Sequence, residues 1–179
     1  MRGSGSPAYS IVDLTAAYGP QNSSRVERGF AFTESYQHLL IVDEFEFTAG
    51  ATVRNVTWTM HTKAAIELST VRTRDGSRVA SSAVLSLGGA HLHATVIEPA
   101  SAKFSAATVD LLPPQKPSAG VSKLQVHLNL NLAASSSRLT DAGPVTRIVV
   151  GLSLSEVAAA VTPSPLARWK AAGPFAGAD

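Results

Sequence analysis

One stretch of the chain alternates apolar and polar residues over its whole length. Between residues 121 and 132 the apolar positions are Leu124, Val126, Leu128, Leu130 and Leu132, and the polar positions are Lys123, Gln125, His127, Asn129 and Asn131. Successive side chains of a β-strand point to opposite faces, so this alternation predicts a strand with one packed face and one solvated face. Such strands are typical of antiparallel sheets.

The same alternation recurs along the chain, while helical periodicity is almost absent. Further strands are predicted at residues 9–14, 26–32, 36–47, 53–62, 64–71, 79–87, 91–97, 104–111 and 145–154. Turn-forming residues separate them, among them Arg74–Ser77 and the pair Gly88-Gly89, which suits the positive φ angles of a tight hairpin. The pattern predicts an all-β domain, an antiparallel β-sandwich of about nine to ten strands. We expect the strand at 145–154 to pair with the one at 121–132.

The 179 residues suit a single domain, and a composition of 45% hydrophobic and 16% charged residues is globular. We expect residues 1–8 to form a disordered leader, 9–162 the β-sandwich, and 163–179 an ill-ordered tail rich in Pro, Ala and Gly. A single helical turn is expected at residues 155–161. The first seven residues lack the apolar core of a signal peptide, so the sequence predicts no compartment.

Composition also argues against several partners. The net charge is only +2, without a run of Lys or Arg, so nucleic acid is not an expected partner. No stretch reaches the roughly 18 apolar residues of a membrane helix, so a membrane is not expected either. The chain has no cysteine, which excludes disulfides and thiol chemistry.

Histidines are the first candidates for chemistry. His91 and His93 share one face of a predicted strand at a spacing that zinc can use, with His61, His127 or a carboxylate as a third ligand from elsewhere. The opposite face of that strand is apolar, so we favour the interpretation that both histidines lie on a solvated face. His61 ends a strand without a neighbouring nucleophile or orienting group, so we do not expect it to be a general base.

Asp43 is more informative, because it falls on the strand face that carries Ile41 and Phe45, whereas Glu44 and Glu46 fall on the other face. A buried carboxylate needs a partner. Arg28, on the apolar face of the preceding strand, is the nearest candidate. We therefore predict a structural ion pair between Arg28 and Asp43 rather than a catalytic carboxylate.

Other motifs are missing. The serines lack a nucleophile elbow, and the glycines form neither a Walker nor a dinucleotide-binding pattern. Trp58 alternates with core residues and Trp169 lies in the tail, so no aromatic platform for sugars is predicted. From these residues we assign no catalytic, cofactor-binding or metal-binding residue and no cofactor.

Several segments together resemble the C-terminal β-domain of the heparinase II/III-like polysaccharide lyase family. They are Ile11–Tyr18, Arg28–Phe32, Leu40–Phe45, Val56–Ala64, Gly88–Ala90, Ile97–Pro99 and Phe104. The resemblance runs from about Tyr9 to Leu154, and it depends on the order and spacing of these pieces.

The resemblance implies a β-sandwich that scaffolds a catalytic α/α-toroid in an enzyme that cleaves acidic polysaccharides by β-elimination. The family's catalytic tyrosine and histidines, and its zinc ligands, would all precede Tyr9, so this chain is expected to be inactive alone. The family is mostly secreted or periplasmic. An acidic polysaccharide, a toroid domain, or a second copy paired through exposed strand edges are the partners that follow. A carbohydrate-binding or adhesion module and a structural remnant without a ligand remain alternatives.

Overall fold

The computed structural model describes residues 8–19, 21–33, 36–48, 51, 55–72, 78–109, 120–129, 145–156 and 163–175. Nearly all the regular structure in these residues is β-strand, as the alternating pattern predicts. The strands are β1 (Tyr9–Asp13), β2 (Ser23–Phe32), β3 (His38–Phe47), β4 (Asn55–Thr62), β5 (Ala65–Arg72), β6 (Arg78–Leu87), β7 (Ala90–Glu98), β8 (Phe104–Thr108), β9 (Ser122–Asn129) and β10 (Val145–Ser153). Two short helices, α1 (Thr15–Tyr18) and α2 (Leu166–Ala172), complete the described elements.

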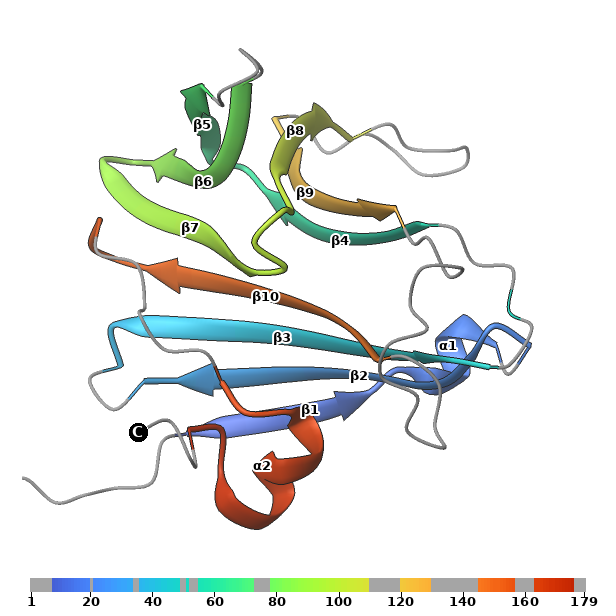
Figure 1. Ribbon diagram of the computed structural model, residues 1–179. Helices are drawn as coiled ribbons and strands as arrows, with labels where there is room; N and C mark the ends of the chain where they lie inside the picture. Colours follow the sequence, from blue (N-terminus) through green and yellow to red (C-terminus); the bar gives the residue numbers. More distant parts are fainter. Residues whose placement is uncertain are drawn as a thin grey trace, which may run out of the picture.

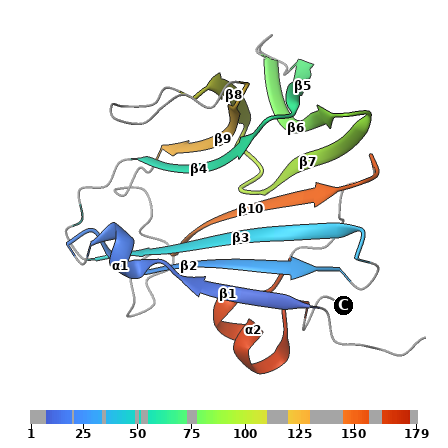
Figure 2. The ribbon, with the colours of Figure 1, turned by 180° about the vertical axis from the view of Figure 1, so that it is seen from behind.

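The strands form two antiparallel sheets. The large sheet has seven strands in the order β1-β2-β3-β10-β7-β6-β5, and the small sheet has three in the order β4-β9-β8. Figures 1 and 2 show the large sheet curling, so that β5 and β6 rise beside β8 while the small sheet covers the concave side. The prediction of an all-β sandwich is therefore confirmed.

The core lies between the two sheets and is built from alternate residues of almost every strand. Trp58 from β4, Leu124 from β9, Ile148 from β10 and Phe45 from β3 belong to this cluster. The rings of Trp58 and Phe104 lie 6.3 Å apart, joining β4 to β8. The alternating positions of 121–129 thus bury their apolar face, as predicted.

A second, smaller cluster covers the other face of the large sheet, which we call the outer face. Helix α2 buries Leu166 and Trp169 completely against Ala31 of β2, Val42 of β3 and Val149 of β10. The expectation of an ill-ordered tail was therefore wrong for residues 163–175, which form an ordered helical segment on this face (Figure 1).

Two further details differ from the sequence analysis. Strand β10 does not pair with β9: it lies between β3 and β7 in the large sheet, whereas β9 pairs with β4 and β8. The predicted loop after β1 contains the single turn α1. All but the last residue of the expected leader at residues 1–8, the turn at 74–77 and most of the expected helical turn at 155–161 lie outside the described residues.

Candidate functional site

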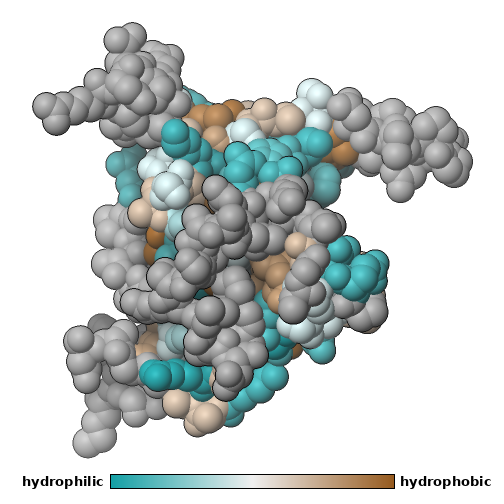
Figure 3. Space-filling model, turned by 45° about the vertical axis from the view of Figure 1, so that its right-hand side comes forward, coloured by the Kyte–Doolittle hydropathy of each residue, from teal (hydrophilic) through white to brown (hydrophobic). Residues whose placement is uncertain are grey.

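A hollow lined by residues of β4, β6 and β7 lies between the sheets at one end of the sandwich. It has a volume of about 350 Å³ and is mostly apolar, with Met60, Ala64, Leu85, Leu87, Ala90, Leu92 and Leu154 among its lining residues. Leu87 and Leu154 are largely exposed at its mouth. Elsewhere, on the side drawn in Figure 3, hydrophobic residues occur in separate small areas between hydrophilic ones. The hollow is thus a concave and mostly apolar surface with two exposed leucines beside it.

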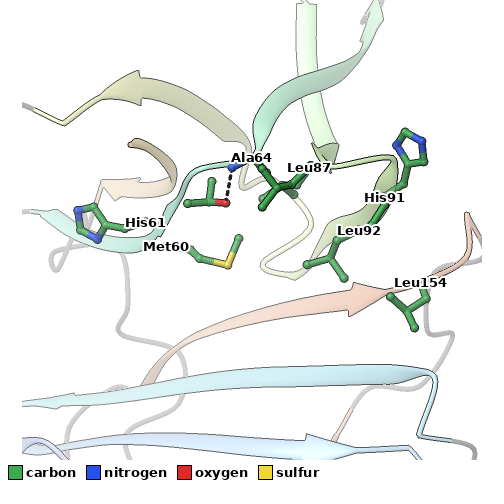
Figure 4. A pocket seen from close by; sticks show the side chains of 10 residues that line it. Met60, His61, Ala64, Leu87, His91, Leu92 and Leu154 are labelled. Atoms are coloured by element: carbon green, nitrogen blue, oxygen red, sulfur yellow. Dashed lines mark hydrogen bonds between the residues drawn. The ribbon is translucent and has the colours of Figure 1, made fainter. Parts of the chain in front are cut away.

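The two histidines that border this hollow do not converge on it. Figure 4 shows His61 and His91 on opposite sides with their imidazoles turned away, whereas Met60, Leu92 and Leu154 project into the space. The backbone of the β4–β5 turn is held by a hydrogen bond of 3.0 Å from the Ala64 amide to the Thr62 hydroxyl. The hollow can therefore accept an apolar group, but it presents no pair of groups for acid–base chemistry.

Each of the candidate zinc-binding histidines lies in ordinary strand surroundings. His91 is exposed and lies 2.9 Å from the Ser86 hydroxyl of the neighbouring strand, and His127 lies 3.1 Å from the Thr57 hydroxyl. His93 lies two residues after His91 on β7 and is half-buried. Among the described residues no three His, Asp or Glu side chains come close enough together to hold a metal ion.

Arg28 and Asp43 form the predicted ion pair. They are opposite each other in the register of β2 and β3, and Arg28 Nε and Nη2 each donate to a carboxylate oxygen at 2.6 Å. The Asp43 side chain is only 4% exposed, so this two-pronged pair is what makes its burial tolerable. The hydrogen bond to Asp43 raises the pKa of Arg28 above its ordinary value, with burial acting in the opposite direction. Neither residue lines the apolar hollow, and the pair joins two neighbouring strands.

Sequence reasoning missed a second charged cluster, on the outer face. Glu27 and Glu44 are both almost completely buried there. Arg25 Nη2 donates to Glu46 at 2.6 Å and to Glu44 at 3.4 Å. Burial alone would lower the pKa of Arg25, but hydrogen bonds to Glu46 and Glu27 hold it above its ordinary value. Arg25 therefore stays charged and paired with these carboxylates.

This cluster meets the C-terminal segment. Glu44 Oε1 accepts a hydrogen bond of 2.9 Å from the Leu166 amide at the start of α2. Arg147 donates from Nη2 to the carbonyls of Pro163 and Ser164 and from Nη1 to Glu98. The sequence carries no local signal for this burial, because an acidic residue on that face of β3 is equally compatible with contact with solvent. Nothing in the residues after β10 indicates that a helix covers it.

Both tryptophans are buried rather than available to sugars. Trp58 is 2% exposed in the core and its Nε1 has no hydrogen-bond acceptor in the described structure. Trp169 is fully buried under α2, where its Nε1 donates to the Ser164 carbonyl at 2.8 Å. Neither can form a stacking platform without rearrangement.

The fold and these sites define an all-β sandwich domain with an ion pair between two neighbouring strands of the large sheet and a helix packed on the outer face of that sheet. No helix among the described residues is long and apolar enough to cross a membrane.

Comparison with known proteins gives one informative likeness. No protein-family profile and no curated protein matches the sequence. Among solved structures, the chain is similar to a heparinase III with methylated lysines, at 12% sequence identity and a TM-score of 0.45. The match covers 83% of this chain but only 19% of the heparinase III chain, so this chain spans about a fifth of that protein. The match does not single out a particular domain of that protein.

Proposed function

We propose that this chain is the C-terminal β-sandwich portion of a heparinase II/III-like polysaccharide lyase, and that it scaffolds a catalytic α/α-toroid rather than carrying out β-elimination itself. One observation supports this proposal above others. The segments that resemble the family fold into the packed framework: Arg28 and Asp43 lock β2 to β3, and Trp58 fills the core. Their chemistry is that of a scaffold.

The apolar hollow gives the scaffold a surface for a neighbouring domain. Leu87 is 60% exposed and Leu154 is 74% exposed at its mouth. Apolar side chains gathered at a concave surface are typical of protein–protein contacts. In the proposed assembly the toroid covers this end of the sandwich.

The proposal is tested first with the purified chain. We expect no unsaturated-uronate absorbance when it is incubated with heparan-type, alginate or pectic polysaccharide, and such absorbance would overturn the proposal.

The reading frame upstream of the coding sequence supplies the second test. An α/α-toroid encoded there supports the scaffold, particularly if the co-expressed toroid is retained by this chain and lost with Leu87→Lys. Absence of any toroid that binds the chain contradicts it.

A carbohydrate-binding module is the second candidate, and the exposed face of the small sheet favours it. Thr57, Thr59 and His61 of β4 and Lys123, Gln125 and His127 of β9 lie on this face. Hydroxyl, amide and imidazole groups hydrogen-bond to sugars, and Lys pairs with carboxylates. No Asp or Glu occurs within the described strands β4, β8 and β9.

This second candidate predicts salt-sensitive binding to an acidic polysaccharide by the chain alone. Retardation of the chain in gels containing alginate should weaken with Lys123→Gln and with added salt, because the contact is electrostatic. Lys170→Gln, on the outer face of the other sheet, is the matched control. Equal retardation of all three proteins would argue against a site on the small sheet.

A further inference from the structure

We propose that the outer face of β1, β2, β3 and β10 is a recognition groove for a short helix with the pattern Leu-x-x-Trp, and that residues 163–175 occupy it as an exchangeable ligand. The same segment supplied from outside the chain can take its place. This inference is independent of the lyase proposal.

The segment is a self-closed unit. The Ser164 amide donates to the Pro174 carbonyl at 2.8 Å, which ties its two ends together. Within it, Trp169 Nε1 donates to the Ser164 carbonyl, and the Gly173 amide closes the helix on the Trp169 carbonyl. Its shape is thus set by its own hydrogen bonds as well as by the sheet, as expected of a peptide ligand.

The groove is shaped for two anchor side chains. A Cβ added to Gly29 would lie 2.4 Å from Leu166 Cδ2 and 2.7 Å from Trp169 Cζ3, so only glycine leaves room for both anchors. Ala31 and Val42 complete the floor. At the rim, the Tyr9 hydroxyl donates to the Trp169 carbonyl at 2.8 Å, and the Tyr9 ring packs edge-on against the indole.

Polar contacts fix the direction of the helix. Glu44 accepts from the Leu166 amide, while Arg147 binds the two carbonyls that precede it. Lys170 Nζ lies 3.2 Å from Glu27 at the other side of the helix. The groove therefore binds four polar groups of the segment at fixed places: one amide donor, two carbonyl acceptors and the ammonium group of Lys170. Such fixed polar contacts are a basis of specific recognition.

The geometry also explains why the ligand can leave without unfolding the sheet. Helix α2 has seven residues, too few for a helix that is stable by itself. Its contacts lie on one face, whereas β2, β3 and β10 are each paired along both edges for much of their length. Local release of such a segment requires less free energy than global unfolding.

The experiment uses the whole chain, folded and then cut. A specific protease site is placed between β10 and α2, and the purified protein is cleaved after folding. A fluorescently labelled peptide of residues 163–175 is then added. We expect saturable binding as the cleaved segment exchanges out, and displacement of the label by the unlabelled peptide. A peptide with Trp169→Ala should compete at least about tenfold more weakly, because it leaves the anchor site empty.

Variants of the groove supply the matched controls. Glu44→Ala should weaken peptide binding about tenfold or more, because it removes the acceptor of the Leu166 amide and a partner of Arg147. Glu46→Ala changes the same residue type on the same face, but the Glu46 side chain accepts hydrogen bonds from Arg25 rather than from the segment, so this variant should bind like the parent. Gly29→Ala should bind most weakly, because its Cβ overlaps both anchors.

Three results would overturn the proposal. They are failure of the labelled peptide to exchange into the cut protein, equal competition by the Trp169→Ala peptide, and loss of the far-ultraviolet sheet signal when the segment is released. Circular dichroism of each variant, recorded before cleavage, distinguishes a misfolded groove from a weakened one.

Discussion

The ion pair between Arg28 and Asp43 joins β2 to β3 through two side-chain hydrogen bonds, in addition to the backbone ladder between these strands. It lies on the same strand faces as Val26, Ile41 and Phe45, which form the core. Loss of one partner would leave the other charge in an environment that solvates it poorly. Its contribution is therefore best measured by removing each partner separately and then both.

Asp43→Ala is expected to lower the free energy of unfolding by about 3–5 kcal/mol, since it leaves Arg28 without its partner. The double variant Arg28→Met, Asp43→Leu should recover most of that loss, because two apolar groups replace two charges. Urea unfolding of the single and double variants measures both. A single variant that unfolds at the parent's urea midpoint would show that the pair does not stabilise the fold.

Asp13 offers a test of charge at the surface. Its carboxylate accepts the Thr15 amide at 2.9 Å, and hydrogen bonds from Thr15 lower the pKa of Asp13 below its ordinary value of 3.8. The native state thus binds this proton less readily than the unfolded chain. Its stabilising effect is present above pH 3.8 and is lost as the pH falls through the lower native pKa. A carboxyl-carbon NMR titration should give a midpoint below that of a model Asp peptide; a midpoint at or above it contradicts the prediction.

Residue-level inference from the sequence succeeded where a side chain broke a clear pattern. Asp43 was found because it interrupts an apolar strand face, and Arg28 because it occupies the same place on the neighbouring strand. Glu44 breaks no alternation, since the other face of β3 can be polar, so its near-complete burial could not be inferred. What buries it is a helix more than a hundred residues away in the chain.

At the scale of elements, the Gly88-Gly89 hairpin was predictable because its signal is local. Leu87 and Ala90 are paired, so the loop has two residues, with φ angles of 57° at Gly88 and 82° at Gly89. Both are in the left-handed region that suits a tight hairpin turn. The strand boundaries follow equally local signals. Helix α2 was not predictable, because a helix of seven residues is held by what it packs against rather than by its own propensity.

Gly88→Val is expected to destabilise the protein by about 1–2 kcal/mol, because a branched side chain is strained in a left-handed conformation. A Cβ at Gly88 meets no atom within 4 Å, so the effect is one of backbone conformation alone. Gly88→Asn is the matched control and should remain close to the parent, since Asn tolerates this region. Thermal unfolding of the two variants measures the difference, and equal melting temperatures would contradict it.

For the whole molecule, the sequence predicted the layers but not the order of strands within them. The alternation of apolar and polar residues indicates which face of a strand is buried. Edge strands and central strands show the same alternation, so it does not indicate where in the sheet a strand lies. The pairing of β10 with β3 and β7 joins segments separated by about a hundred residues or by about fifty, and no local pattern specifies such partners. The same long-range pairing leaves β1 and β5 at the two edges of the large sheet.

Self-association follows from these open edges and is the expectation at this scale. Among the described strands β1 pairs only with β2, and it carries exposed Val12, so we expect that a second copy can extend the sheet there. Light scattering should show an average mass that rises with concentration. Val12→Lys should reduce that rise, because charge on an edge strand opposes pairing, whereas Val145→Lys, of similar exposure on β10, should not. Dimers that persist in Val12→Lys but vanish when residues 163–175 are cut away would instead show that the copies associate by exchanging α2. A parent protein that stays strictly monomeric at high concentration would contradict both association through the β1 edge and association through α2.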